Sequence, residues 1–143
     1  MANVQALTIT STNGLLNWMD NSLAKPGHMN LSWASAAAGT VSYGIAAEYA
    51  SDNPAHARGV VKVKGTIVKI VTNPSATAPT ASYDIWIYDK DGVDICSGNL
   101  TDRSATITEQ YIPDPPIHVD GELTLSIANA GDGKLGTIEI YFG

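Results

Sequence analysis

Hydrophobic and polar residues alternate with a period of two along most of the chain after about residue 58. Such alternation is typical of β-strands that bury one face and expose the other. The alternating stretches are 59–72, 81–88, 93–96, 104–111, 121–128 and 137–142, and Gly, Pro, Asn and Asp residues separate them. Because short strands with closely spaced turn signals are typical of all-β domains, we predict an antiparallel β-sandwich or small β-barrel of the jelly-roll or β-tulip type.

The longest stretch, residues 59–72, predicts one long strand that bends at Gly65 and ends at Pro74. Proline ends it because proline lacks the N–H that a further ladder bond would need. The side chains expected on the buried face of this strand are those of Val61, Val63, Ile67 and Val71.

The stretch 81–88 predicts the first strand of a hairpin that turns through 89–92 into 93–96. Gly92 occupies the turn position that requires a positive φ, which glycine adopts without strain. The side chains expected on the buried face of the first strand are those of Tyr83, Ile85 and Ile87.

A second hairpin is predicted from 121–128 and 137–142, which the Gly-rich loop 129–136 joins. In its first strand the alternation predicts that Leu123, Leu125 and Ile127 face inward, and the side chains expected to face outward are those of Glu122, Thr124 and Ser126. Between the two hairpins, 104–111 predicts a weaker strand that ends at a run of prolines.

The first third of the chain is less regular. Residues 4–10 predict a strand and 13–23 a short helix, whereas 29–33 and 40–49 are interpreted as strands or extended chain. We therefore expect a single β domain of 143 residues with at most one short helix. Residues 1–27 are interpreted as an extended N-terminal arm.

Charge is scarce in this sequence. Charged residues make up 15% of the chain, below the roughly 25% of an ordinary soluble domain, and the net charge is −6. The few basic residues do not cluster, so neither nucleic acid nor an anionic membrane is expected as a partner. No stretch reaches the roughly 18 apolar residues of a transmembrane helix. These features predict a protein that is made in the cytoplasm and buries its surface against neighbours.

Few residues in the sequence suggest a catalytic or metal-binding site. The three histidines lie far apart in loop-like contexts. Asp89, Asp91 and Asp94 superficially resemble a calcium loop, but predicted strands flank them where an EF-hand has helices. Cys96 is the only cysteine, which excludes an intrachain disulfide, and we interpret it as a small core residue. We expect no enzyme activity, catalytic residue, cofactor or metal.

Aromatic residues provide the strongest binding signal. The candidates are Trp18, Trp33, Tyr43, Tyr49, Trp86 and Tyr88. Trp86 and Tyr88 share one face of a predicted strand, so they could form a flat platform for a sugar ring. Core packing and subunit contacts are alternative roles for all six side chains.

Several short sequence segments from about residue 65 onward resemble one family of proteins. These segments are Val71-Thr72-Asn73-Pro74, Ala78-Pro79-Thr80, Tyr83-Asp84-Ile85, Asp91-Gly92-Val93-Asp94, Thr108-Glu109-Gln110, Val119-Asp120-Gly121-Glu122-Leu123-Thr124-Leu125, Asn129-Ala130-Gly131 and Gly136-Thr137-Ile138. In these the chain resembles small structural proteins that tailed bacteriophages encode beside their capsid genes. The resemblance covers a little over half of the chain and lies in segments that are predicted to form turns and strands.

The resemblance implies a capsid decoration, or cement, protein that stabilises the head shell. It implies a homotrimer on the capsid surface of the virion, with the major capsid protein as partner and no catalytic residue. Proteins of this kind often add an N-terminal strand to a neighbouring subunit, and Val4, Leu7 and Ile9 could supply it. The partner-binding candidates are Val4, Leu7, Ile9, Trp18, Trp33, Trp86 and Tyr88.

Three other functions are alternatives to a decoration protein. The tryptophans and the β architecture also suit a carbohydrate-binding or receptor-binding domain of a fibre or spike. A tail or connector subunit would show the same sequence features. A glycan hydrolase would need two carboxylates that face each other across a groove, and no pair in the sequence indicates one.

Overall fold

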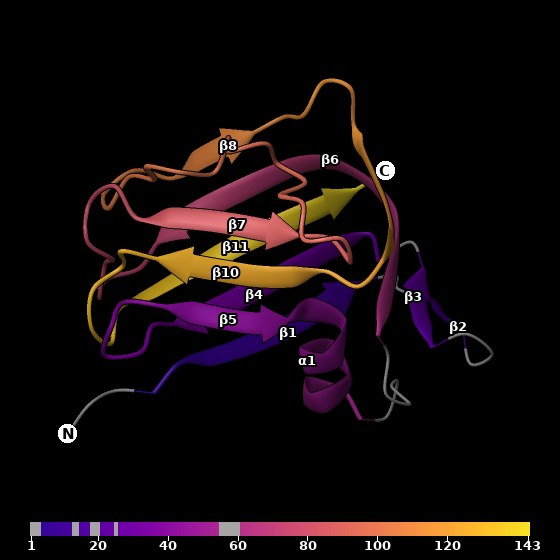
Figure 1. Cartoon of the computed structure of the whole chain (residues 1–143), viewed down its shortest axis with the longest axis horizontal. Helices are drawn as coiled ribbons and strands as arrows, with labels where there is room; N and C mark the ends of the chain where they lie inside the picture. Colours follow the sequence, from indigo (N-terminus) through magenta and orange to yellow (C-terminus); the bar gives the residue numbers. More distant parts are fainter. Residues whose placement is uncertain (1–3, 13–14, 18–20, 25, 55–60) are drawn as a thin grey trace.

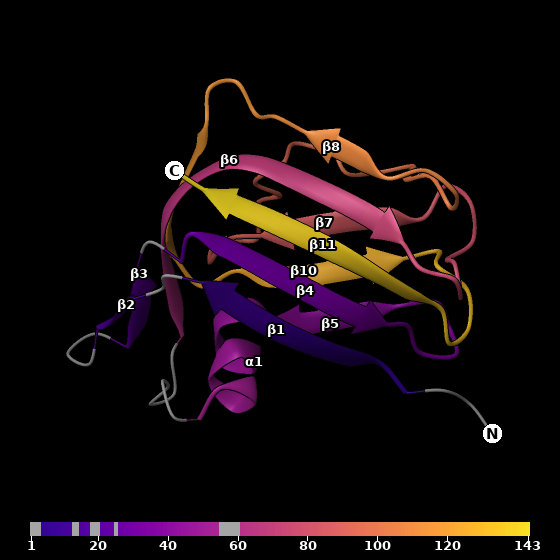
Figure 2. The ribbon, with the colours of Figure 1, turned by 180° about the vertical axis from the view of Figure 1, so that it is seen from behind.

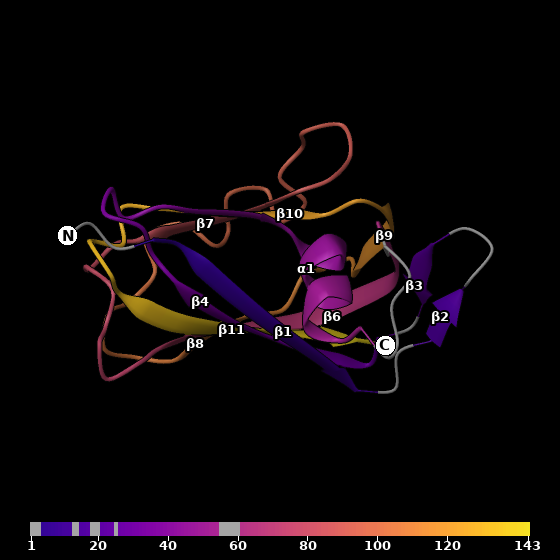
Figure 3. The same cartoon turned by 90° about the horizontal axis from the view of Figure 1, so that it is seen from below.

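The computed structural model describes residues 4–12, 15–17, 21–24, 26–54 and 61–143. This part of the chain contains eleven strands and one helix, in two β-sheets that face each other (Figures 1 and 3). The predicted all-β sandwich or small barrel is therefore confirmed. No helix in the described ranges is long and apolar enough to cross a membrane.

The large sheet has eight strands and curls around one side of the core (Figures 2 and 3). Its main path runs β1–β4–β11–β6–β3–β2, and β8 and β9 also pair with β6. All pairs are antiparallel except β3 with β6. The bounds are β1 Ala6–Thr12, β2 Leu15–Asn17, β3 Ser22–Ala24, β4 His28–Ala34, β6 Lys62–Pro74, β8 Glu109–Tyr111, β9 Ile117–Gly121 and β11 Leu135–Phe142.

The small sheet has three antiparallel strands in the order β5–β10–β7. Their bounds are β5 Val41–Gly44, β7 Asp84–Tyr88 and β10 Thr124–Ala128. The helix α1 (Ile45–Asp52) follows β5 directly and lies beside β1, at one end of the sandwich (Figures 1 and 2).

The core lies between the sheets and consists of alternate residues from facing strands. Residues from the large sheet include Leu7, Ile9, Met29, Leu31, Trp33, Val63, Ile67, Ile70, Ile138 and Ile140. The small sheet and α1 contribute Val41, Ile45, Tyr49, Ile85, Ile87, Leu125 and Ile127. Full burial of one such aliphatic side chain contributes roughly 1.5–3 kcal/mol, so these two layers supply most of the stabilisation.

The helix lies in a different segment from the one predicted. Within 13–23, the described residues form β2 and the start of β3, so the predicted helix is wrong. The helix instead occupies 45–52, where the sequence Ile-Ala-Ala-Glu-Tyr contains good helix formers. Ile45, Ala46 and Tyr49 become buried on one side of this helix. Burial of that side against the core explains why so short a segment is helical.

The long strand β6 changes register along its length. Val63 and Ile67 are buried in its first part, whereas Ile70 and Thr72 are buried in its second part. A register shift in the pairing with β11 accompanies this change, because Tyr141 pairs with Lys69 and Phe142 with Ile67. An extra residue in one strand turns every later side chain to the opposite face. The prediction that Val71 lies on the buried face is therefore wrong, since Val71 is half-buried. The prediction for Val61 is also wrong, because Val61 precedes β6 and is 39% exposed.

Neither predicted hairpin forms as a pair of adjacent strands, although 137–142 lies within strand β11 as predicted. Residues 93–96 form turns and a single bridge, Tyr88 to Asp94, although the Ile95 N–H still donates to the Ile87 carbonyl at 2.9 Å. The loop 129–136 does not close a hairpin, because β10 and β11 belong to different sheets. Within 104–111, only the last three residues are a strand.

Residues 6–12 of the expected N-terminal arm belong to the large sheet. Strand β1 pairs with β4 over seven residues, from Ala6 with Ala34 to Thr12 with His28. This pairing confirms the predicted strand near the N-terminus. It also means that residues 6–12 lie against the protein's own core and are not free.

Candidate functional site

The structure separates the predicted partner-binding residues into two groups. Leu7, Ile9 and Trp33 lie in the core, with side chains 6%, 0% and 2% exposed. Trp86 and Tyr88 are half-buried on the outer face of β7, and Val4 is 80% exposed near the N-terminus. Trp18 lies outside the described residues. Of the predicted set, the structure therefore brings only Trp86 and Tyr88 together at the surface.

The outer face of the large sheet is broad and weakly charged. One row across four strands consists of Thr8, Ser32, Thr137 and Asn73. An apolar strip lies beside this row and borders a shallow hollow of about 330 Å³ whose lining includes Ala6, Ala34 and Leu135.

Charged groups gather at the opposite end of the same face. His28 Nε2 lies 3.2 Å from Glu139 Oε1, and the His28 ring stacks on Tyr141 with ring centroids 4.6 Å apart. The Lys69 ammonium lies 5.3 Å from the centre of the Tyr141 ring. These side chains interact with one another, which leaves the middle of the face to uncharged hydroxyl and amide groups.

The outer edges of β1 and β5 are closed by the protein itself. The Ile9 N–H donates to Asp52 Oδ2 at 2.7 Å, and the Asn53 side-chain amide donates to the Ile9 carbonyl at 3.0 Å. On β5, the Gln5 side chain bonds both the N–H and the carbonyl of Ser42, at 2.8 and 3.2 Å. An edge whose backbone groups are already bonded cannot pair there with another chain, so these contacts act against strand addition.

The outer face of the small sheet carries the aromatic pair. Trp86 lies opposite Ser126 on β10, and Tyr88 lies opposite Thr124. Beyond β10, the same face continues with exposed Ser42 and Gly44 on β5. Two rings therefore stand beside a floor of small hydroxyl-bearing side chains.

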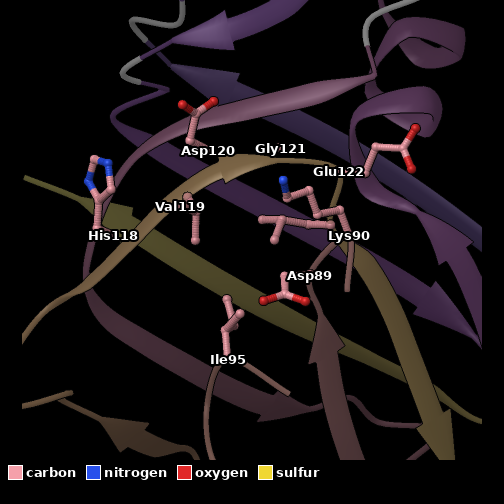
Figure 4. Close-up of a pocket in the computed structure, with 9 residues that line it drawn as sticks. Asp89, Lys90, Ile95, His118, Val119, Asp120, Gly121 and Glu122 are labelled. Carbon is pink, nitrogen blue, oxygen red and sulfur yellow. The ribbon is translucent and has the colours of Figure 1, made fainter. Parts of the chain in front are cut away.

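A groove continues from this aromatic face around the end of β7. Figure 4 shows its inner part, a cavity of about 250 Å³ whose lining includes Asp89, Lys90, His118, Asp120 and Glu122. These residues come from the turn after β7, from β9 and from the segment that links β9 to β10. The inner cavity is therefore lined by both acidic and basic side chains.

Two further hollows adjoin this cavity. A hollow of about 430 Å³ is lined by Tyr88 and Thr124 as well as by Lys90 and Glu122, and another of about 390 Å³ reaches Lys62. Because Lys90 and Glu122 line all three spaces, the aromatic face and the groove form one continuous surface.

The acidic residues of the 89–98 loop are used to shape the loop. Asp89 Oδ1 accepts the N–H groups of Asp91 and Val93 at 2.9 and 3.0 Å. Asp94 accepts the Cys96 N–H at 3.1 Å and the Gly98 N–H at 2.7 Å. Within the described ranges, no group of three or more His, Cys, Asp or Glu residues is placed to hold a metal ion. The turn interpretation of this loop thus has a direct structural basis, and Gly92 takes the predicted positive φ of 79°.

Cys96 is buried below this loop and is chemically protected. Its side chain is 0% exposed. Burial, and secondarily the nearby Asp94 carboxylate, raises the pKa of its thiol to about 12. Because the thiolate is the reactive form, Cys96 is not a nucleophile at neutral pH and acts as a core residue.

Comparison with known proteins gave no match to a family model, to a curated protein or to a solved structure.

The groove was not predicted from the sequence. Lys90 was interpreted only as part of a turn, and Glu122 only as the outward residue of a strand. They meet because the turn after β7 folds toward Gly121, whose φ of 151° lets the chain change direction between β9 and β10. The alternation of residues along one strand does not predict which residues of two distant segments will lie close together. The aromatic face was predicted, because Trp86 and Tyr88 are two residues apart on one strand.

Proposed function

We propose that this protein is a non-enzymatic structural subunit of a tailed-phage particle, namely a capsid decoration protein that binds the major capsid protein as a homotrimer. The observation that supports it best is the wide outer face of the large sheet, whose middle row is Thr8, Ser32, Thr137 and Asn73. The resemblance of the second half of the chain to phage structural proteins points to the same class.

An uncharged face of this kind suits a protein that is held on a shell. Burial of charged groups costs free energy unless each group is paired, whereas small hydroxyl groups lose little when they become buried with partners. The apolar strip of Ala6, Ala34 and Leu135 adds surface whose burial is favourable, and Leu135 is 41% exposed. A contact centred on this row and strip therefore stabilises the complex without desolvating the His28–Glu139 pair at the other end of the face.

The closed sheet edges determine how such a contact forms. Because Asp52 and Asn53 already bond Ile9, a neighbouring subunit cannot pair with the middle of the β1 edge. We infer contact through the face of the large sheet. Val4, which precedes β1 and is 80% exposed, is then the candidate from the N-terminal set for an additional contact.

Repetition strengthens a weak single contact. In a homotrimer on a regular shell, binding of one subunit places the other two at high effective concentration over their own sites. Each face therefore needs only modest affinity.

The proposal is tested with the purified full chain and undecorated, expanded capsids of the phage that encodes it. Light scattering of the free protein should give three times the subunit mass of 15.0 kDa. Electron microscopy of the mixture should show density at symmetry-related positions on the shell. If the protein remains unbound at saturating concentration, the decoration proposal is wrong. Density at the tail or at the neck would instead identify a tail or connector subunit.

A matched pair of variants tests which face binds. Ser32→Arg places a long cation in the middle of the large-sheet face, and Ser42→Arg places the same side chain on the small-sheet face. Both serines are exposed in strands, so both variants should fold. Capsid binding should be lost in Ser32→Arg and retained in Ser42→Arg. The reverse result would show that the small sheet contacts the shell.

A further inference from the structure

We propose that the outer face of the small sheet, together with the groove beside it, is a binding site for a neutral oligosaccharide. The site consists of Trp86 and Tyr88 on β7, Thr124 and Ser126 on β10, and the groove residues Lys90 and Glu122. It lies on the opposite side of the sandwich from the proposed capsid-binding face, so the two proposals are independent.

The aromatic pair provides the stacking surface. Trp86 and Tyr88 are two residues apart on one strand, which places them about 7 Å apart on the same face. Their cross-strand neighbours, Ser126 and Thr124, are too small to cover the rings. The C–H face of a pyranose ring is apolar, so it packs on an aromatic ring while the sugar hydroxyls stay in water or meet polar groups. Two rings in line fit an extended chain of sugars better than a single sugar.

Different aromatic residues occupy the core. Trp33 and Tyr83 are buried there, with ring centroids 5.7 Å apart. Trp86 and Tyr88 lie on the other side of β7 from Ile85 and Ile87, which face the core. The protein therefore carries two large aromatic side chains on a face that its own core does not use.

The polar groups needed for sugar hydroxyls lie within the same surface. Within the described part of the chain, the side-chain hydroxyls of Thr124 and Ser126 form no hydrogen bond, and they lie next to the rings. The hollow of about 430 Å³ continues from Tyr88 and Thr124 to Lys90 and Glu122. A carboxylate accepts and an ammonium donates, so the groove offers hydrogen bonds of both kinds to a vicinal diol.

Lys90 is held across the groove by the shape of the chain. A Cβ placed on Gly121 would lie 3.6 Å from Lys90 Cδ, so the aliphatic part of Lys90 packs over this glycine. Figure 4 shows the Lys90 side chain running up beside Gly121. Gly121 thus leaves room for the lysine stem, which runs along the groove while Lys90 as a whole stays exposed.

Charge determines the class of sugar. The 430 Å³ hollow is lined by two carboxylates, Asp89 and Glu122, against one ammonium, that of Lys90. The whole chain carries a net charge of −6. Uronates, sialates and sulfated sugars are therefore repelled, and a neutral oligosaccharide is favoured.

The experiment is a calorimetric titration of the full-length protein with neutral hexasaccharides of glucose, mannose, xylose and N-acetylglucosamine. Oligogalacturonate is the anionic comparison. At least one neutral hexasaccharide should bind and change the tryptophan fluorescence, and oligogalacturonate should bind at least tenfold more weakly. Trp86→Ala and Tyr88→Ala should each weaken binding about tenfold or more, as truncation of a central aromatic contact does.

Tyr141→Ala is the matched control, because it removes an aromatic ring from the outer face of the other sheet. Its sugar affinity should equal that of the wild type, and circular dichroism should show that all three variants are folded. The proposal is overturned if no neutral hexasaccharide binds, if oligogalacturonate binds more tightly, or if Trp86→Ala binds as the wild type does. It is also overturned if the wild type self-associates and Trp86→Ala dissociates it, since the rings would then be a subunit contact.

Discussion

Replacement of Gly136 by alanine tests the packing of the core most directly. Gly136 lies on the buried side of β11 and pairs with Trp33 on β4. A Cβ at this position would lie 2.5 Å from Trp33 Cζ2, 2.8 Å from Cε2 and 3.0 Å from Nε1. The indole therefore occupies the space that any other residue would fill, which is how an aromatic ring covers a glycine across two strands.

The cost follows from how little Trp33 can move. Its side chain is 2% exposed, and the Tyr83 ring packs beside it with centroids 5.7 Å apart. An extra methyl group in a packed core costs typically about 1–3 kcal/mol, and a rigid ring held by neighbours places Gly136→Ala in the upper half of that range. For a chain of this length, a loss of about 2 kcal/mol lowers the melting temperature by roughly 5–10 °C.

Urea unfolding followed by tryptophan fluorescence measures this loss. Gly44→Ala is the control, because its Cβ would meet only Ala47 Cβ, at an ordinary 3.8 Å. Gly44 is the N-cap of α1, where alanine is less favourable than glycine, so Gly44→Ala should lower the free energy of unfolding by less than about 1 kcal/mol.

Trp33→Leu, which makes room for the new methyl group, should reduce the cost of Gly136→Ala. The two changes should be coupled by about 0.5–3 kcal/mol in a double-mutant cycle. If Gly136→Ala is as stable as the wild type, or if its cost simply adds to that of Trp33→Leu, the ring does not depend on the glycine and the reasoning is refuted.

Three further predictions concern ionisable groups. The pKa of Glu48 is raised by partial burial and secondarily by Asp52, so ionisation of the Glu48 carboxyl opposes folding. Any stability that Glu48 contributes in acid is therefore lost as the pH rises through its folded pKa. Glu48→Gln should therefore raise the free energy of unfolding at pH 7 by roughly 0.2–0.5 kcal/mol and leave it unchanged at pH 3, and an equal gain at both values would contradict the charge argument. Cys96 should react with a thiol reagent at pH 8 only as fast as the protein unfolds, because burial raises its pKa to about 12; fast labelling of the folded protein would show that the site opens locally. Asp94→Ala should lower the free energy of unfolding in urea by about 1–3 kcal/mol, because it leaves backbone N–H groups without an acceptor. Asp91→Ala changes an exposed turn residue and should lower it by less than about 0.5 kcal/mol. Equal losses in the two variants would refute the role of Asp94.

The period-two pattern was sufficient to predict which side of several strands is buried. Ile85 and Ile87 of β7, and Leu125 and Ile127 of β10, are buried as expected. This worked because neighbouring side chains of a strand point to opposite faces wherever the strand lies in the fold. For the same reason Trp86, between Ile85 and Ile87, had to face outward. The aromatic face was therefore predictable from local sequence.

The partners of each strand depended on the tertiary structure. β10 and β11 are neighbours in sequence but lie in different sheets, and the shift in β6 that turns Val71 away from the buried face is visible only in its pairing with β11. The helix α1 is short, and its burial against the core decides its conformation more than its propensity does.

The groove depends on the same long-range arrangement. Lys90 and Glu122 are 32 positions apart in the chain and line one surface only because two loops meet at the end of the small sheet. By itself, the sequence determined the class of fold, the buried side of the regular strands and the aromatic pair, because these follow from backbone geometry over a few residues. Strand partners, the position of the helix and the polar lining of the groove required the folded chain, because they arise from contacts between residues that are far apart in sequence.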